Sequence, residues 1–152
     1  MTATDEQKLQ SVLRHAFHND RKLFDLFSNI TRASVPEAHA AVLRGSSITG
    51  HRHSDGAPFD ADGPGTSDLD LTLIGNRVLD YFSAFWIPAV HSKPLSEKDP
   101  DIAPALVPLR RRLMDLVQRP VNIQGTVDWV QFFRGDIMEQ PYLTLYGELK
   151  EP

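Results

Sequence analysis

The sequence predicts an α+β fold in which helices flank a small mixed sheet. Apolar residues recur every three or four positions in residues 4–30 and 102–117, which is typical of amphipathic helices. Short runs containing Val, Leu and Ile at residues 40–44, 69–74 and 119–127 are typical of strands. The 152 residues are predicted to form one domain, because no internal repeat or linker divides the chain.

The N-terminal segment 4–30 is predicted to be helical. Its start, TDEQ from Thr4 to Gln7, has the form of a capping box. HND at residues 18–20 interrupts the helical period, so a second helix or a kinked continuation follows. SVPE at residues 34–37 is predicted to open a short helix, and the first strand follows at residues 40–44.

The middle of the chain contains a long irregular segment. Residues 45–67 are rich in Gly, Ser, Asp and Pro and show no period, which indicates a functional or disordered loop. The second strand, 69–74, ends at Gly-Asn. Asn76 is predicted to cap a helix that stops at Pro88, before a polar connection at residues 89–100.

The C-terminal third is predicted to hold the remaining elements of the sheet. A helix over residues 102–117 precedes a third strand at 119–127. Residues 128–133 suit either a strand or a short helix, and residues 141–149 suit a fourth strand.

The composition excludes several classes of protein. The chain has no cysteine, which excludes disulfides and thiolate metal sites. No apolar run approaches the roughly 18 residues of a membrane helix, so we expect a soluble, cytoplasmic protein. The net charge of −4 argues against a broad basic surface for nucleic acid.

Two short motifs combine into a candidate site. Asp68 and Asp70 stand two positions apart, so their side chains share one face of a strand, about 6–7 Å apart. Paired carboxylates can hold divalent cations that bridge to phosphate oxygens. Gly45 and Ser46 follow the first strand, where small residues let backbone N–H groups approach a phosphate. Together these motifs predict a metal–nucleotide site.

In these motifs the sequence resembles the DNA polymerase beta-like nucleotidyltransferase superfamily, particularly its small bacterial members. The family signature is a hydrophobic residue, Gly-Ser, a spacer, and Asp-hydrophobic-Asp-hydrophobic. Residues 43–46, with Arg44 before the glycine, and residues 68–71 match this signature. The resemblance implies a nucleotidyltransferase-like fold that transfers a nucleoside monophosphate from an NTP to an acceptor, using Mg²⁺ or alternatively Mn²⁺.

The resemblance also implies roles for individual residues. Asp68 and Asp70 would hold the metals, and Gly45 and Ser46 would hold the triphosphate. Further candidates for nucleotide contact are Ser47, Arg44 and Arg52.

The sequence departs from the family pattern in two places. The spacer 47–67 is longer than usual, which implies an inserted loop. The third family carboxylate is expected on the later strand, where this chain has Asn122. An amide can ligate weakly or accept a hydrogen bond, but it cannot take up a proton.

Three explanations of Asn122 are open. The protein is a weak or inactive relative, or Asn122 is an engineered replacement of Asp, or another carboxylate substitutes. The candidates for that substitute are Asp128, Asp136 and Glu139.

Other polar clusters have simpler interpretations. His51, His53 and Asp55 are spaced to suit a transition metal, but we prefer a solvated loop because a third firm ligand is lacking. A calcium loop starting at Asp60 is rejected because Leu71 occupies the position of the bidentate Glu. The consecutive arginines 110–112 are interpreted as a solvated helix face. The aromatic residues of segments 82–86 and 129–133 are interpreted as core.

The sequence therefore predicts a minimal nucleotidyltransferase. Its acceptor is an RNA end, a protein hydroxyl or a small molecule, and the bacterial resemblance implies a toxin-like role. A homodimer, a partner chain or the inserted loop would supply acceptor recognition. The alternatives are a non-catalytic nucleotide-binding module, which Asn122 supports, and a protein-interaction domain that binds no nucleotide.

Overall fold

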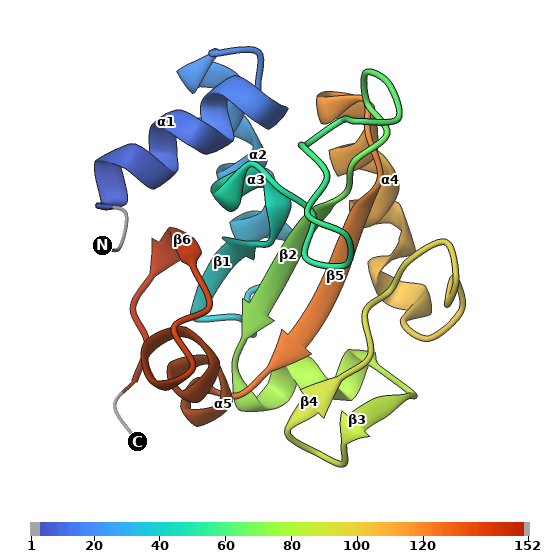
Figure 1. Cartoon of the computed structure of the whole chain (residues 1–152). Coiled ribbons are helices and arrows are strands. Elements are labelled where there is room, and N and C mark those ends of the chain that lie inside the picture. The colour runs from blue at the N-terminus through green and yellow to red at the C-terminus, as the bar shows by residue number, and fades with distance from the viewer. Residues whose placement is uncertain (1–3, 151–152) are drawn as a thin grey trace.

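The computed structural model describes residues 4–150 and contains a six-stranded mixed sheet with helices around it (Figure 1). The strand order is β3-β4-β5-β2-β1-β6, in which β2 and β5 are parallel and the other neighbours are antiparallel. The strands are β1 (Ala40–Arg44), β2 (Leu69–Ile74), β3 (Phe85–Ile87), β4 (His91–Ser92), β5 (Val121–Thr126) and β6 (Tyr142–Gly147). The predicted α+β class is confirmed, with two more strands than expected.

Two separate helices form the N-terminal segment, α1 (Asp5–Ala16) and α2 (Arg21–Ser34). The capping box is present, because Thr4 Oγ1 accepts the Gln7 N–H at 3.1 Å and Gln7 Oε1 accepts the Thr4 N–H at 2.9 Å. His18 and Asn19 take left-handed backbone angles, with φ of 53° and 56°, and this separates the helices.

The predicted short helix at residues 34–37 is wrong, because those residues form the end of α2 and a turn. Sheet pairing leaves no room for a helix there. The His39 N–H already donates to the Ile74 carbonyl at 3.0 Å, five residues after α2 ends.

The predicted helix from Asn76 to Pro88 is also wrong. The segment begins as a 3₁₀ helix, η1 (Asn76–Tyr81), whose first turn has no side-chain cap, and then extends into β3. Pairing of β3 with β4, and of β4 with β5, outweighs the local helical period. The predicted polar connection therefore contains β4.

The remaining helices differ in detail from the prediction. The helix expected over 102–117 consists of a 3₁₀ turn, η2 (Pro104–Leu106), followed by α4 (Val107–Val117). The short-helix alternative for 128–133 is correct, because α5 (Asp128–Phe132) continues into a π-helical turn, η3 (Phe133–Ile137). The segment predicted as loop begins with a four-residue helix, α3 (Ser46–Thr49). Among residues 4–150, no helix combines the length and apolar character needed to span a bilayer.

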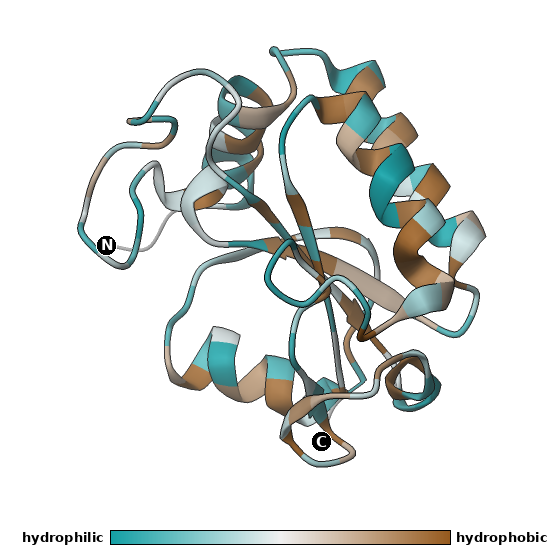
Figure 2. Ribbon diagram, turned by 90° about the vertical axis from the view of Figure 1, so that its right-hand side faces the viewer, coloured by the Kyte–Doolittle hydropathy of each residue, from teal (hydrophilic) through white to brown (hydrophobic). Residues whose placement is uncertain are grey.

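The core lies on one face of the sheet. Leu69, Leu71 and Leu73 of β2 are almost completely buried and pack in the main apolar cluster with residues of α1, α2 and α4. The helices alternate hydrophilic and hydrophobic residues along their turns, as Figure 2 shows. Because strand side chains alternate between faces, Asp70 and Thr72 point to the opposite face.

An ion pair between the buried Arg119 and the half-buried Asp60 anchors the long loop. The Arg119 guanidinium donates to both oxygens of Asp60, at 2.9 and 3.1 Å. The same carboxylate accepts the N–H groups of Ser67 and Gly65 at 2.9 and 3.3 Å. Asp60, which was considered and rejected as a calcium ligand, therefore connects the long loop to the rest of the protein.

Candidate functional site

The candidate site begins where β2 and β5 run side by side. Asp70 and Asn122 are register partners in this parallel pair. Asn122 Nδ2 donates to Asp68 Oδ2 at 3.0 Å and to Asp70 Oδ1 at 3.2 Å. The two aspartates and the predicted third position therefore form one cluster on the sheet face opposite the main core.

The backbone at the end of β1 approaches this cluster closely. Gly45 has a φ of +85°, and a Cβ at this position would lie 2.6 Å from Asp70 Oδ2. Only glycine combines a left-handed backbone with this close approach. The Gly-Ser motif thus belongs to the site through its glycine.

Two arginines stand beside Asp70. Arg44 is the register partner of Asp70 on β1, and Arg134 comes from η3. Both guanidinium groups donate to Gln140 Oε1, Arg44 at 3.1 Å and Arg134 at 3.2 Å.

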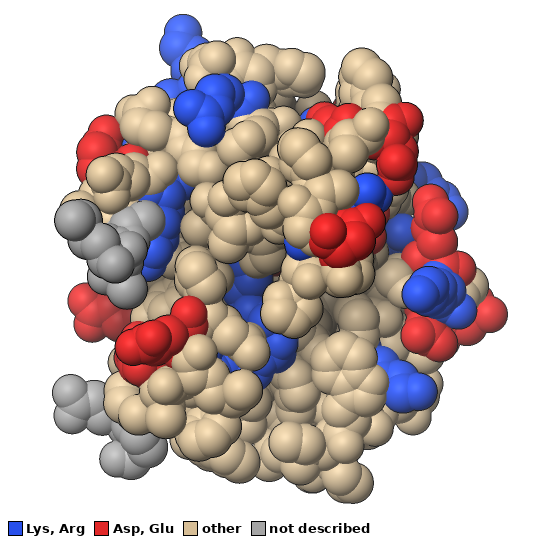
Figure 3. Space-filling model, viewed as in Figure 1, with Lys and Arg blue, Asp and Glu red and all other residues tan. Residues whose placement is uncertain are grey.

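Arg44 and Arg134 both line a cavity of about 180 Å³, here called the arginine cavity. Its lining comprises Arg44, Gly45, Asp70, Leu71, Thr72, Trp86, Pro94, Asn122, Gln124 and Arg134. Figure 3 shows Lys and Arg side chains inside a hollow near the middle of the viewed face.

The charges in the arginine cavity are perturbed by burial and by one another. Burial raises the pKa of Asp70, and the charge of Asp68 adds to this against the Asn122 hydrogen bond and the two arginines. Burial also lowers the pKa of Arg134 to about 10, with the charge of Arg44 contributing. Burial lowers the pKa of Arg44 as well. Asp70 is the one carboxylate lining this cavity, and two guanidinium groups line it too, so the cavity suits an anionic ligand.

His91 holds Arg134, one of the residues that line the arginine cavity. Burial, with the charges of Arg134 and Arg44, lowers the pKa of His91 to about 4, so the imidazole is neutral at pH 7. Arg134 Nη1 lies 2.9 Å from His91 Nε2 and can only donate, so Nε2 accepts. The proton is therefore on Nδ1, which lies 3.1 Å from Thr126 Oγ1.

A second and larger cavity, of about 410 Å³, adjoins the first. We call it the Trp86 cavity, and it is lined by Asp68, Trp86, Lys93, Pro94, Ser96, Glu97, Lys98, Asp99, Pro120 and Asn122. Trp86, Pro94 and Asn122 line both cavities. Asp70 lines the arginine cavity and Asp68 the Trp86 cavity, so the carboxylate pair stands at the junction.

Three of the predicted nucleotide-binding residues lie elsewhere. Arg52 pairs with Asp62 and Asp55 within the long loop, at 2.6 and 3.2 Å. Ser47 is completely buried beneath α1, where its carbonyl accepts the Ser11 hydroxyl at 2.9 Å. Ser46 lines neither cavity. These three residues therefore lie outside the lining of both cavities, and their contact with a nucleotide stays a prediction.

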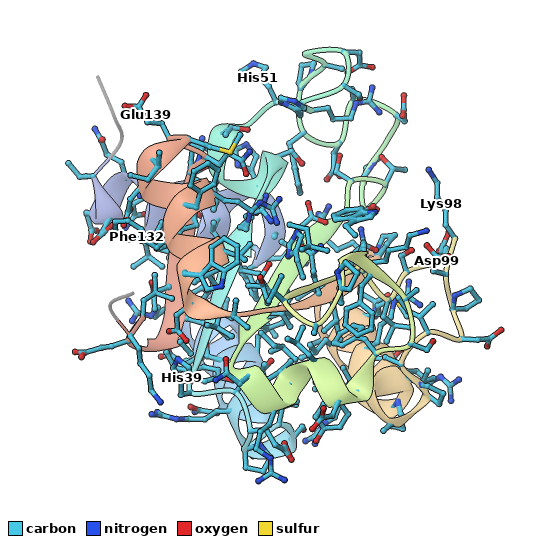
Figure 4. All side chains as sticks on the ribbon, turned by 90° about the horizontal axis from the view of Figure 1, so that it is seen from below. His39, His51, Lys98, Asp99, Phe132 and Glu139 are labelled. Carbon is cyan, nitrogen blue, oxygen red and sulfur yellow. The ribbon has the colours of Figure 1, made fainter. Side chains whose placement is uncertain are left out.

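No candidate substitute for the third carboxylate lines either cavity. Asp128 follows the far end of β5, where it pairs with His39 at 2.8 Å. Asp136 lies 3.5 Å from the Tyr142 hydroxyl. Figure 4 shows Glu139 on the opposite side of the view from Asp99 of the Trp86 cavity. None of these three candidates therefore lies beside Asn122, although Glu97 and Asp99 line the Trp86 cavity with it.

The structure adds residues that the sequence analysis assigned elsewhere. Trp86 was expected in the core but is 56% exposed, and Trp129 and Phe133 are also exposed. Arg134, to which the sequence analysis gave no role, lines the cavity from the η3 turn. Gln124 lies two positions after Asn122 on β5, so strand alternation was the one available signal for it.

The other predicted clusters are mostly exposed, with Arg110 as the exception. His51, His53 and Asp55 are exposed. Across residues 4–150, no group of three or more His, Asp or Glu side chains is placed to hold a metal. Arg111 and Arg112 are exposed, and Arg110 Nε donates to the Val121 carbonyl at 2.7 Å.

Comparisons with protein-family models, curated proteins and solved structures gave no significant match. The geometry of the site therefore carries the functional argument.

Proposed function

We propose that the protein is a metal-dependent nucleotidyltransferase that moves a nucleoside monophosphate from an NTP to an acceptor hydroxyl. The supporting observation is the junction itself, where Asp68, Asp70 and Asn122 adjoin a cavity lined by two half-buried arginines. Oxygen ligands for a cation and cationic donors for a polyphosphate thus occur together. The reaction uses NTPs, so the proposal places the protein in the cytoplasm.

The residues present suit Mg²⁺ or Mn²⁺. Asp68 and Asp70 supply carboxylate oxygens, and Asn122 has an amide oxygen, which are the ligand types that hard cations prefer. The repulsion between the two carboxylates, now bridged by one amide group, is a physical reason for a cation there. When bound, the cation would neutralise the phosphate charge and polarise the α-phosphate.

The chain's own groups have distinct roles in this proposal. Arg44 and Arg134 bind oxygens of the β- and γ-phosphates, and Gly45 keeps the backbone close to Asp70. The acceptor oxygen forms a bond to the α-phosphorus while the bond to the pyrophosphate oxygen breaks, and pyrophosphate leaves. Asn122 cannot accept the acceptor's proton, so that proton passes to water.

One observation favours a second candidate function, a non-catalytic module that binds Mg-NTP. Asn122 already donates a hydrogen bond to each aspartate, and apart from these two the carboxylates that line the cavities are Glu97 and Asp99, both in the Trp86 cavity. A site built this way can hold a nucleotide without a general base. The toxin-like role and the identity of the acceptor stay predictions.

Transfer of label from α-³²P-NTPs to pooled RNA, protein and small molecules tests the main proposal. Transfer by the unsubstituted chain that is lost in Asp70→Asn supports it, and Asn122→Asp is expected to transfer faster, by a general-base factor of roughly 10²–10⁴. Asp62→Asn is the matched control, because Asp62 is exposed in the loop. Binding of Mg-NTP without transfer by any form would favour the non-catalytic module, and absence of binding would contradict both.

A further inference from the structure

The Trp86 cavity is not explained by phosphate binding. Its volume of about 410 Å³ falls within the range of small-molecule sites, roughly 300–1,000 Å³. Three carboxylates and two ammonium groups line it, namely Asp68, Glu97, Asp99, Lys93 and Lys98. The excess of carboxylates in this lining repels a polyphosphate. We therefore expect the Trp86 cavity to bind another part of the ligand.

Trp86 is the distinctive group of this cavity. It lies on the edge strand β3 with 56% of its surface exposed. Its ring contacts His91, with ring centroids 5.5 Å apart. His91 is itself held by Arg134 and Thr126, so the indole has a fixed support beneath it. A supported and exposed indole offers a stacking surface for a flat aromatic ligand.

The polar groups around Trp86 include both hydrogen-bond acceptors and hydrogen-bond donors. Glu97 and Asp99 can accept hydrogen bonds from ribose hydroxyls and from base amino groups, while Lys93 and Lys98 can donate to base carbonyls. Figure 4 shows Lys98 and Asp99 together on the segment that follows β4. A nucleoside carries donors, acceptors and a π face, and thus matches this lining better than a phosphate does.

We propose that the Trp86 cavity binds a nucleobase with its sugar, stacked on Trp86, while the arginine cavity holds the phosphates. Asn122 and Pro94, which line both cavities together with Trp86, mark the boundary. The inference rests on the proposed function and adds the residues that recognise the base. The base belongs either to the incoming NTP or to the terminal nucleotide of an acceptor strand, because both present the same chemistry.

Trp86 fluorescence provides a direct test. The chain has two tryptophans, so Trp129→Phe leaves Trp86 as the single reporter. In the presence of Mg²⁺, the Trp129→Phe protein is titrated separately with each of the four NTPs, inorganic tripolyphosphate and a short single-stranded RNA. Stacking predicts quenching by nucleotides or RNA, and no quenching by tripolyphosphate. Quenching by NTPs identifies the incoming base as the source, and quenching by RNA alone identifies the acceptor.

Binding constants of variants give the second readout. Trp86→Ala is expected to raise the Kd of the quenching ligand roughly 10- to 100-fold, the range for a base–aromatic stack, and to leave the Kd of tripolyphosphate unchanged. Trp129→Ala is the matched control, because Trp129 is a similarly exposed tryptophan on α5 outside both cavities.

The possible outcomes separate the two proposals. If tripolyphosphate and NTPs bind equally well and Trp86→Ala changes neither Kd, the base site is overturned while the phosphate site stands. If neither NTP, RNA nor tripolyphosphate binds, the proposed function fails, and the base site fails with it.

Discussion

At the scale of single residues, the groups of the candidate site are closely packed and share their hydrogen-bond partners. Gly45 leaves room for an Asp70 oxygen that any Cβ would displace. Asn122 bridges two carboxylates with one amide nitrogen. Arg44 and Arg134 share a single acceptor on Gln140. Changes of one methyl group or one charge at these positions should therefore have measurable effects.

Gly45→Ala is expected to lower the free energy of unfolding by about 2–4 kcal/mol, because it combines a left-handed backbone with overpacking against Asp70. Gly56→Ala is the matched control, since Gly56 has a φ of +73° but nothing within 4 Å of its Cβ position. It should cost only about 1–2 kcal/mol. Urea denaturation measures both, and equal losses would argue against the contact with Asp70.

At the scale of elements, pairing between distant segments decides what local periodicity leaves open. The periodicity of residues 76–88 predicted a helix, yet residues 85–87 form β3, which pairs with β4 in a hairpin at the edge of the sheet. That hairpin carries both Trp86 and His91 to the site. The long loop is likewise held to a distant segment by the ion pair between Asp60 and Arg119.

The burial of His91, together with the charges of Arg134 and Arg44, makes the stability of the hairpin sensitive to acid. The pKa of His91 is lowered from 6.5 to about 4, so the unfolded chain binds a proton before the folded one does. Stability is therefore full above pH 6.5 and falls by about 2–3 kcal/mol as pH falls through 6.5 toward 4. His91→Gln should flatten this part of the stability–pH curve, which urea denaturation at several pH values measures. An unchanged curve would show that His91 titrates normally.

The stability contributed by the Asp60–Arg119 ion pair also depends on pH, but in a lower pH range than that of His91. Burial alone would raise the pKa of Asp60, but hydrogen bonds from Arg119, Ser67 and Gly65 and the charge of Arg119 lower it to about 2. Its contribution, on the order of 1–2 kcal/mol, is present above pH 4 and is lost as pH falls toward 2. Asp60→Asn should therefore be less stable than the natural chain at pH 6, and the difference should shrink below pH 4.

Asp62→Asn serves as the comparison for Asp60→Asn. Asp62 pairs with Arg52 on the surface, with 68% of its side chain exposed. Such exposed pairs contribute about 0–1 kcal/mol. If the two variants lose equal stability at pH 6, the loop is not tied to the body through Asp60.

At the scale of the whole molecule, the two faces of the sheet have different roles. One face packs against α1, α2 and α4 in the main apolar cluster. The opposite face carries Asp70 and Asn122, whose side chains line the cavities. Neighbouring residues of β2 should therefore respond to substitution in opposite ways.

Leu71→Ala and Asp70→Asn test this division. Leu71 is 1% exposed on the core face, so its truncation should cost about 2–5 kcal/mol of stability without changing the charges of the site. Asp70→Asn removes a buried charge whose pKa is raised, so the folded state should become more stable at pH 7. The affinity for Mg-NTP should respond in the opposite way: Asp70→Asn should weaken binding more than Leu71→Ala does. A loss of stability in Asp70→Asn would show that the carboxylate supports the fold through its arginines.

The sequence by itself determined the α+β class, the positions of β1, β2, β5 and β6, and the shared face of Asp68 and Asp70. Strand alternation and helix capping act between residues a few positions apart, so they can be read directly from the chain. Only the tertiary structure decided that Asn122 bridges both aspartates and that Arg134 and Trp86 reach the same junction. These contacts join segments 12 to 90 positions apart, and such pairings depend on how the whole sheet assembles rather than on any local pattern.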